Sequence, residues 1–142
     1  LMFKSLHHVP LDQLDTALAE IARVLVPGGL AYFSAPVFAG AFNEVMRVFH
    51  DEERVRAEAQ AALARARSAG VLEGVQEIHF DSPIAFRDFD AFMDRIVNVT
   101  HTEHRLEGER LAEVRRRFEP HLGPAGARFE RPMHVSVMRR PA

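Results

Sequence analysis

The sequence predicts an α/β fold built on a largely parallel sheet, and three adjoining features within residues 6–36 support this prediction. Apolar residues recur at steps of three and four, as on the buried side of an amphipathic helix, at Leu11, Leu14, Leu18, Ile21 and Leu25. Pro27-Gly28-Gly29 then ends the helix, because proline cannot continue it and glycine readily adopts the left-handed conformation. Leu30–Ala35 follows as a nearly continuous apolar strand, which is typical of a parallel sheet covered on both faces.

The first residues are predicted to be the end of a neighbouring parallel strand. Leu1–Ser5 is short and apolar at its start, and it is followed by Leu6-His7-His8-Val9-Pro10, where Pro10 suits the first turn of the helix. Ligands of open α/β sheets bind at the carboxyl ends of the strands. We therefore expect Lys4, Ser5 and His7 to lie at a ligand-binding edge.

The middle of the sequence predicts two helices separated near His50-Asp51. The first carries an aromatic stripe at helical spacing, made of Phe38, Phe42, Val45, Met46 and Phe49. The second, residues 51–69, is rich in alanine. Its pairs Glu52–Arg56 and Arg54–Glu58 are spaced i,i+4, which predicts that they lie on a solvated face.

The C-terminal half predicts further strands and helices in alternation. Val75–Phe80 alternates as a half-buried strand that Pro83 ends. Helical spacing then recurs twice, first at Phe89, Phe92, Met93 and Ile96, and then at Leu111, Val114, Phe118 and Leu122. Phe129–Met138 is the last predicted strand, with His134 and Ser136 on one face and Pro132 at its start or on a sheet edge.

The composition is that of one soluble globular domain spanning residues 1–142. The net charge of -2 gives no reason to expect a nucleic acid or an anionic membrane as partner. The absence of cysteine excludes disulfides and thiolate metal sites and fits a cytoplasmic protein. No apolar run approaches the roughly 20 residues that a membrane span needs.

The order LHHVP, amphipathic helix, Val26-Pro27-Gly28-Gly29 and apolar strand resembles the class I S-adenosylmethionine-dependent methyltransferases. The resemblance covers most of the chain. It implies a Rossmann-like sheet that contains the end of strand 4, strand 5 and two later strands, the last antiparallel beside strand 5. It also implies helices on both faces and an extended helical insertion after strand 5, at about residues 38–70.

The cofactor-binding features of that family have no counterpart in this sequence. The family binds S-adenosylmethionine through a glycine-rich loop after its first strand and an acidic residue at the end of its second. None of the eight glycines here lies in a G-x-G-x-x-G pattern. We therefore expect the chain to be the C-terminal portion of a methyltransferase domain, without the cofactor-binding N-terminal half and inactive alone.

The resemblance assigns site residues near the first strand. It gives Phe3, Lys4 and Ser5 as contacts of S-adenosylmethionine, and it places His7 or His8 against the methyl acceptor. A histidine there can serve as a general base, because its unperturbed pKa is near neutrality. The alternative is that Lys4 is solvated and the two histidines only open the helix.

The same resemblance places the helical insertion over the acceptor. Phe38, Phe42, Met46 and Phe49 would then form an apolar wall for a small molecule. The alternative is that these side chains are packed in the core.

Two polar clusters have simpler interpretations than a binding site. Arg115, Arg116 and Arg117 are predicted to be a solvated face, with phosphate binding as the alternative. His101 and His104 have the spacing of a metal-binding pair on a helix, but no third ligand is evident. A loop or helix start is therefore favoured there, and no bound metal is expected.

A second function class follows from the sheet edge at residues 1–5. An apolar strand edge invites pairing with another chain. We therefore expect a homo-oligomer or association with a separate N-terminal half, and the chain could be a non-catalytic assembly or binding module derived from a methyltransferase. A metal hydrolase built on the eight histidines is a third alternative.

Overall fold

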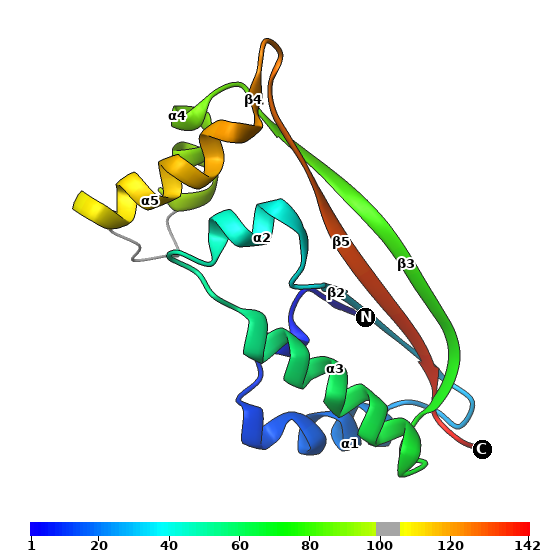
Figure 1. The fold of residues 1–142 in the computed structure, drawn as a ribbon. Helices are drawn as coiled ribbons and strands as arrows, with labels where there is room; N and C mark the ends of the chain where they lie inside the picture. The colour runs from blue at the N-terminus through cyan, green and yellow to red at the C-terminus, as the bar shows by residue number, and fades with distance from the viewer. Residues whose placement is uncertain (99–105) are drawn as a thin grey trace. The chain divides into compact units, whose positions relative to one another are not determined.

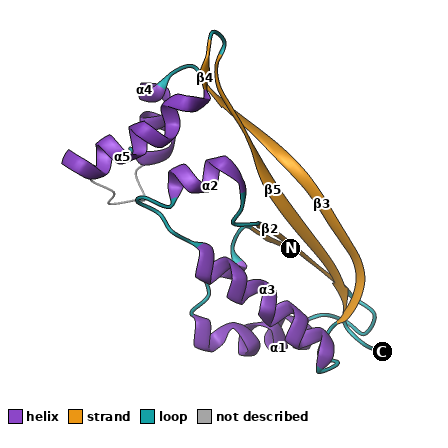
Figure 2. Ribbon diagram, viewed as in Figure 1, coloured by secondary structure: helices purple, strands orange, loops and turns teal. Residues whose placement is uncertain are grey.

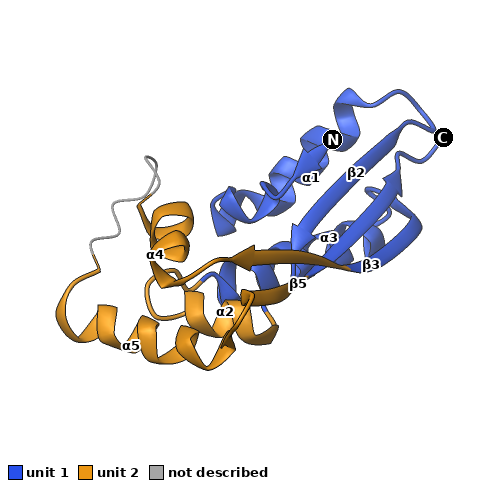
Figure 3. Cartoon of the chain, turned by 90° about the horizontal axis from the view of Figure 1, so that it is seen from above, with its two compact units in different colours: residues 1–38, 52–80, 132–142 blue, residues 39–51, 81–131 orange. Residues whose placement is uncertain are grey.

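The computed structural model describes residues 1–98 and 106–142, and the chain divides into two compact units (Figure 3). Unit 1 contains Leu1–Phe38, Glu52–Phe80 and Pro132–Ala142. Unit 2 contains Ala39–Asp51 and the described part of Asp81–Arg131. Within the described ranges, no helix is both long enough and apolar enough to cross a membrane.

The described strands form one five-stranded sheet with the order β1-β2-β5-β3, and β4 pairs with β5 (Figures 1 and 2). The strands are β1 (Met2–Phe3), β2 (Leu30–Pro36), β3 (Glu73–Phe86), β4 (Leu122–Gly123) and β5 (Gly126–Arg139). β1 is parallel to β2, and β5 is antiparallel to β2 over seven consecutive pairs from Leu30↔Arg139 to Pro36↔Met133. The predicted antiparallel pairing of the last strand with Leu30–Ala35 is therefore confirmed.

The predicted helix over 11–25 forms in two pieces, a 3₁₀ turn η2 (Leu11–Gln13) and α1 (Leu14–Val24). Leu14 and Leu18 are fully buried, as the spacing predicted. Gly28 ends the turn with a φ of 75°, and its N–H donates to the carbonyl of Arg140 at 3.0 Å. The turn is thus hydrogen-bonded to the residue that follows β5, and the chain enters β2 directly after it.

The core of unit 1 lies between one face of the sheet and the helices α1 and α3 (Glu53–Ser68). Small side chains of α3 let the helices and sheet approach closely. The buried cluster consists of Leu6, Leu14, Leu18, Ala22, Ala31, Phe33, Ala59, Ala62, Leu63, Ala66, Leu72 and Met138. Both helices share this cluster, so the expectation of helices on both faces of the sheet is wrong for the described residues of unit 1.

Unit 2 has a core of phenylalanines. Its helices are α2 (Gly40–Met46), α4 (Phe89–Phe92), which continues as one π-helical turn over Met93–Val97, and α5 (Gly108–Phe118), which continues as the 3₁₀ turn η4 (Glu119–His121). The aromatic members of the core are Phe42, Phe49, Phe86, Phe89, Phe92, Phe118 and Phe129. The predicted helix at Phe89–Ile96 is confirmed, although it changes its hydrogen-bond pattern after Phe92. The predicted helix from Leu111 to Leu122 is confirmed only as far as Phe118, because a 3₁₀ turn follows and Leu122 lies in β4, where it is exposed.

The prediction for Val75–Phe80 is wrong in two respects. The strand continues through Pro83 to Phe86, and residues 73–81 are exposed rather than half-buried. β3 is the last strand in the sheet order. A proline is tolerated on such an edge because no ladder hydrogen bond needs its missing N–H.

Pro132 lies inside β5 rather than at its start. It comes one residue before Met133, the last residue paired with β2, and its carbonyl accepts from the Val37 N–H at 2.9 Å. Its missing donor is therefore not needed by the β2 ladder.

The predicted helical stretch over 38–70 is divided between the two units. α2 begins only at Gly40, which has a φ of 81°, so Phe38 lies outside the helix. Phe38 belongs to unit 1, as does α3, whereas α2 belongs to unit 2. The spacing of the aromatic residues predicts a helix that includes Phe38, whereas the observed helix begins two residues later, at Gly40.

Candidate functional site

The carboxyl end of the parallel pair β1–β2 is the candidate site in unit 1. β1 ends at Phe3, and the N–H of Lys4 donates to the carbonyl of Ser34 on β2 at 2.7 Å. Lys4 has a φ of 50°, an uncommon conformation for a residue other than glycine. The chain turns there and enters the short 3₁₀ helix η1 (Leu6–His8).

The three residues assigned to the cofactor lie together at this turn. Phe3 is 61% exposed and its ring lies 5.4 Å from that of Tyr32. Lys4 is exposed and Ser5 is half-buried. Their contact with S-adenosylmethionine stays a prediction.

The two histidines of η1 have different environments. Their ring centroids are 4.2 Å apart, but His7 is buried and His8 is exposed. The Nε2 atom of His7 lies 3.7 Å from Oε1 of Glu52, whose side chain is only 12% exposed. Of the two, His8 is therefore the one that a ligand can reach from solvent.

Glu52 is a site residue that the sequence pattern does not indicate. Arg56 donates from Nε at 2.9 Å and from Nη2 at 2.5 Å to Oε2 of Glu52. The pair was predicted to lie on a solvated face, but both side chains are largely buried. The i,i+4 spacing identified the ion pair, whereas nothing in the sequence places residue 52 beside residue 7.

A pocket of about 200 Å³ lies at the end of β2 in the same unit. It is lined by Pro36, Val37, Phe38, Glu53, Arg56, Ala57 and Gln60. The Arg56 guanidinium lies 5.6 Å from the centre of the Phe38 ring, within the range of a cation–π contact. An apolar wall with one cation at its edge is suited to a small organic molecule.

The residues predicted to form the acceptor wall do not all come together. Phe42 and Phe49 are buried in the core of unit 2, and Met46 packs against that core. Phe38 instead lines the pocket in unit 1. This placement agrees with the core-packing alternative for Phe42 and Phe49, and the acceptor-wall role of all four residues stays a prediction.

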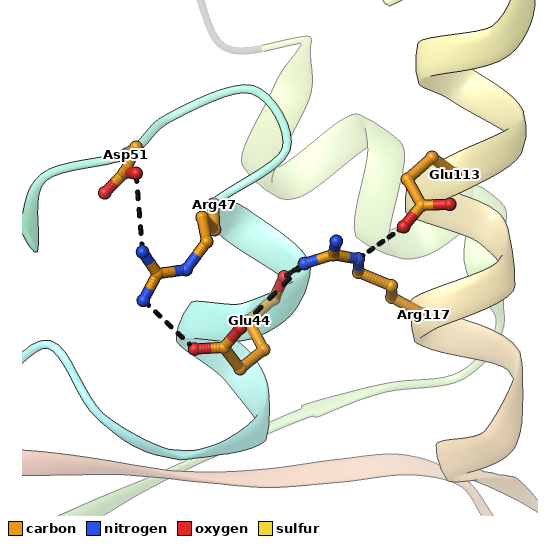
Figure 4. Close-up of polar contacts among 5 residues, drawn as sticks. All are labelled: Glu44, Arg47, Asp51, Glu113 and Arg117. Carbon is orange, nitrogen blue, oxygen red and sulfur yellow. Dashed lines mark hydrogen bonds and ion pairs between the residues drawn. The ribbon is translucent and has the colours of Figure 1, made fainter.

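The basic cluster on α5 contains its own counter-charges, and Arg115 and Arg116 are exposed whereas Arg117 is half-buried. Arg117 donates to Oε1 of Glu113 at 2.6 Å and to the carbonyl of Glu44 at 2.8 Å (Figure 4). Arg116 also pairs with Glu113, and hydrogen bonds from Arg116 and Arg117 hold the pKa of the Glu113 carboxyl below its ordinary value. This agrees with the predicted solvated face. The His101–His104 pair lies outside the described residues.

A second polar cluster, not predicted from the sequence, lies between α3, β3 and β5. The ring nitrogens of His134 lie 2.7 Å from Oε1 of Gln60 and 2.5 Å from Oε2 of Glu77, and Ser136 donates to the same Glu77 oxygen. The His79 ring stacks on that of His134 at 4.4 Å. The placement of His134 and Ser136 on one strand face is thereby confirmed, whereas their partners come from distant elements.

The fold has a counterpart among solved structures. No protein-family model and no curated protein matches the chain. A structure named as a putative methyltransferase from Bacillus halodurans C-125 superposes with a TM-score of 0.60 and is 17% identical in sequence. The match covers 98% of this chain and 62% of that one.

The chain has a methyltransferase-like fold. At this sequence identity the similarity establishes the fold, and the chain spans 62% of the length of that solved chain.

Proposed function

We propose that this chain is the C-terminal portion of an S-adenosylmethionine-dependent methyltransferase that acts on a small-molecule acceptor. The observation that carries the proposal is the similarity in fold to a putative methyltransferase over 98% of the chain. The sheet supports it, because β1 is parallel to β2 and the last strand, β5, lies antiparallel beside β2, as the resemblance implies for strand 4, strand 5 and the last strand of that family.

The cofactor is proposed to lie against Phe3, Lys4 and Ser5. These residues follow the end of a parallel strand, where ligands of open α/β sheets bind. Because no glycine-rich loop of the G-x-G-x-x-G type is present in the sequence, we expect weak cofactor binding by this chain alone. The rest of the cofactor site would come from a further polypeptide segment.

The reaction would transfer a methyl group by in-line displacement. If held by Phe3, Lys4 and Ser5, the cofactor would supply a methyl group, and its sulfur–methyl bond would be exchanged for a bond between that carbon and the acceptor's oxygen or nitrogen. S-adenosylhomocysteine would be the second product, and the acceptor's proton would pass to a base. His8 is exposed and fits the role of the base. His7 is buried next to it and fits the role of a residue that positions the His8 ring. Most of the rate would come from holding the two reactants in line.

Nuclear magnetic resonance tests the cofactor site in this chain. Millimolar S-adenosylhomocysteine is expected to shift the backbone amide signals of Phe3, Lys4 and Ser5, while those of Leu122 and Gly123 stay unchanged. A matched titration with adenosine alone measures how much of the effect the nucleoside causes. Unchanged signals at residues 3–5, or shifts confined to other parts of the chain, would contradict the proposal.

A non-catalytic assembly module is the second candidate, and a different observation favours it. β1 is an end strand of the sheet and carries the exposed side chain of Phe3. An apolar edge with unpaired backbone groups can add a strand from another chain. On this proposal the chain binds a second copy of itself or a separate N-terminal half, and it shows no response to S-adenosylhomocysteine.

A further inference from the structure

Three metal-binding groups converge where η1 meets the start of α3. One ring nitrogen of His7, one of His8 and one carboxylate oxygen of Glu52 all lie within 4.8 Å of one another. Imidazole and carboxylate groups are ligands that zinc and related transition metals prefer. We propose that His7, His8 and Glu52 form a binding site for one divalent transition-metal ion, of the class of zinc(II) and cobalt(II).

The distance between the two buried ligands is close to the one that a bound ion requires. With metal–ligand bonds of about 2.0–2.1 Å at tetrahedral angles, two ligand atoms lie about 3.3 Å apart. The Nε2 atom of His7 and Oε1 of Glu52 are 3.7 Å apart, so a shift of a few tenths of an ångström suffices. His8 is exposed and can complete the set by side-chain rotation.

Arg56 orients the carboxylate for this role. It occupies Oε2 of Glu52 with two hydrogen bonds, while the other oxygen, Oε1, is the one near His7. Outer hydrogen bonds of this kind fix the direction of a metal-binding carboxylate. The burial of His7 and Glu52 restricts both side chains further.

The ligand set also predicts which ions are rejected. The single carboxylate is offset in charge by Arg56, and two of the three ligands are nitrogens. Magnesium and calcium need several oxygen ligands, so they should bind weakly or not at all. Three protein ligands leave a fourth position open to water or a small molecule.

The inference rests on ligand geometry and does not depend on the proposed methyl transfer. A histidine that holds a metal cannot serve as a base at the same moment. Metal binding and cofactor binding are therefore measured separately, and either can fail alone.

The test is titration of the untagged chain with cobalt(II), followed by its visible absorption, and with zinc(II), followed by calorimetry. One equivalent of each metal is expected to bind, with no response to magnesium. His8→Ala and Glu52→Gln are each expected to weaken cobalt binding at least tenfold. His79→Ala, which alters the separate cluster around His134, is the matched control and should bind as the unaltered chain does.

His8 is exposed, so its replacement should leave the fold intact, and circular dichroism checks this. If Glu52→Gln unfolds, His8→Ala decides the outcome alone. The proposal is overturned if cobalt does not bind saturably, if His8→Ala leaves the affinity unchanged, or if His79→Ala abolishes binding.

Discussion

Single residues govern the ends of the short helices of unit 2, and Asp88 is a clear case. Its Oδ1 accepts from the Ala91 N–H at 2.8 Å at the start of α4, and Arg87 donates to its other oxygen at 2.7 Å. These bonds favour the ionised carboxylate. The Ala91 backbone bond, and then Arg87, hold the pKa of Asp88 below its ordinary value.

The lowered pKa of Asp88 gives a pH dependence with a definite sign. A carboxyl whose pKa is lower in the folded chain stabilises the fold above its ordinary pKa. The stabilisation is lost as the pH falls through the lowered pKa. Asp88→Ala should therefore have a lower melting temperature at neutral pH, with a gap that closes in acid. Thermal melts followed by circular dichroism check this, and a gap that widens in acid would contradict it.

Two glycine positions allow the cost of a steric clash to be distinguished from the cost of backbone strain. A Cβ atom on Gly126 would clash with the carbonyl oxygen of Phe86, and the φ of 95° disfavours any other residue. Gly28, with a φ of 75°, has nothing within 4 Å of a Cβ atom. Gly28→Ala should cost about 1–2 kcal/mol of stability, which is the strain alone. Gly126→Ala should cost more than about 4 kcal/mol, because backbone atoms must move.

Urea denaturation of the two glycine variants measures this difference. Equal losses of stability in the two variants would contradict the prediction, because they would mean that the backbone around Phe86 moves to accommodate the added Cβ atom at little cost.

At the scale of the helix, α1 offers a matched pair of substitutions. Leu18 is fully buried in the core of unit 1, whereas Val24 is 67% exposed at the end of the same helix. Leu18→Ala should lower the free energy of unfolding by about 2–5 kcal/mol, through lost burial and the cavity that remains. Val24→Ala should change it by less than about 0.5 kcal/mol.

The α1 pair is compared by the urea midpoint at constant m-value. A similar loss of stability in both variants would contradict the prediction, because it would mean that the buried leucines of α1 contribute no more to stability than an exposed residue of the same helix.

The elements differ in how well their sequences predict them. α1 and β2 are predicted correctly from the sequence alone, because the leucines of α1 are buried and most apolar residues of β2 are buried or half-buried. β3 does not, because Pro83 is a strong local signal whose effect depends on whether the strand lies at a sheet edge. The aromatic stripe misled in the same way, since Phe38 and Phe42 share a helical spacing across a break at Gly40.

The candidate site was predictable only in its local part. The motif Leu6-His7-His8 and the strand before it identified the edge of the sheet. Glu52 and the pocket residues Phe38 and Arg56 reach that edge through the path of the chain, and no local pattern encodes such a path. The cluster around His134 was missed for the same reason.

At the scale of the whole molecule, the exposed edge at β1 predicts self-association. The unaltered chain is expected to exceed its monomer mass of 16.0 kDa in light scattering at micromolar concentration. Phe3→Lys should shift the mass towards that of the monomer, because a charged residue opposes strand pairing. Val26→Lys places the same charge on another exposed apolar residue, outside the strands, and is the control.

A monomeric unaltered chain would contradict this prediction. So would an oligomer that both lysine variants leave intact.

The path of the chain between its units has a consequence for engineering. The backbone crosses the boundary four times, after Phe38, Asp51, Phe80 and Arg131, and two of these crossings fall within β3 and β5. Neither unit corresponds to a contiguous stretch of the gene. Grafting one unit onto another scaffold would need several splice points, two of them inside continuous strands, so recombination should favour exchange of the entire region.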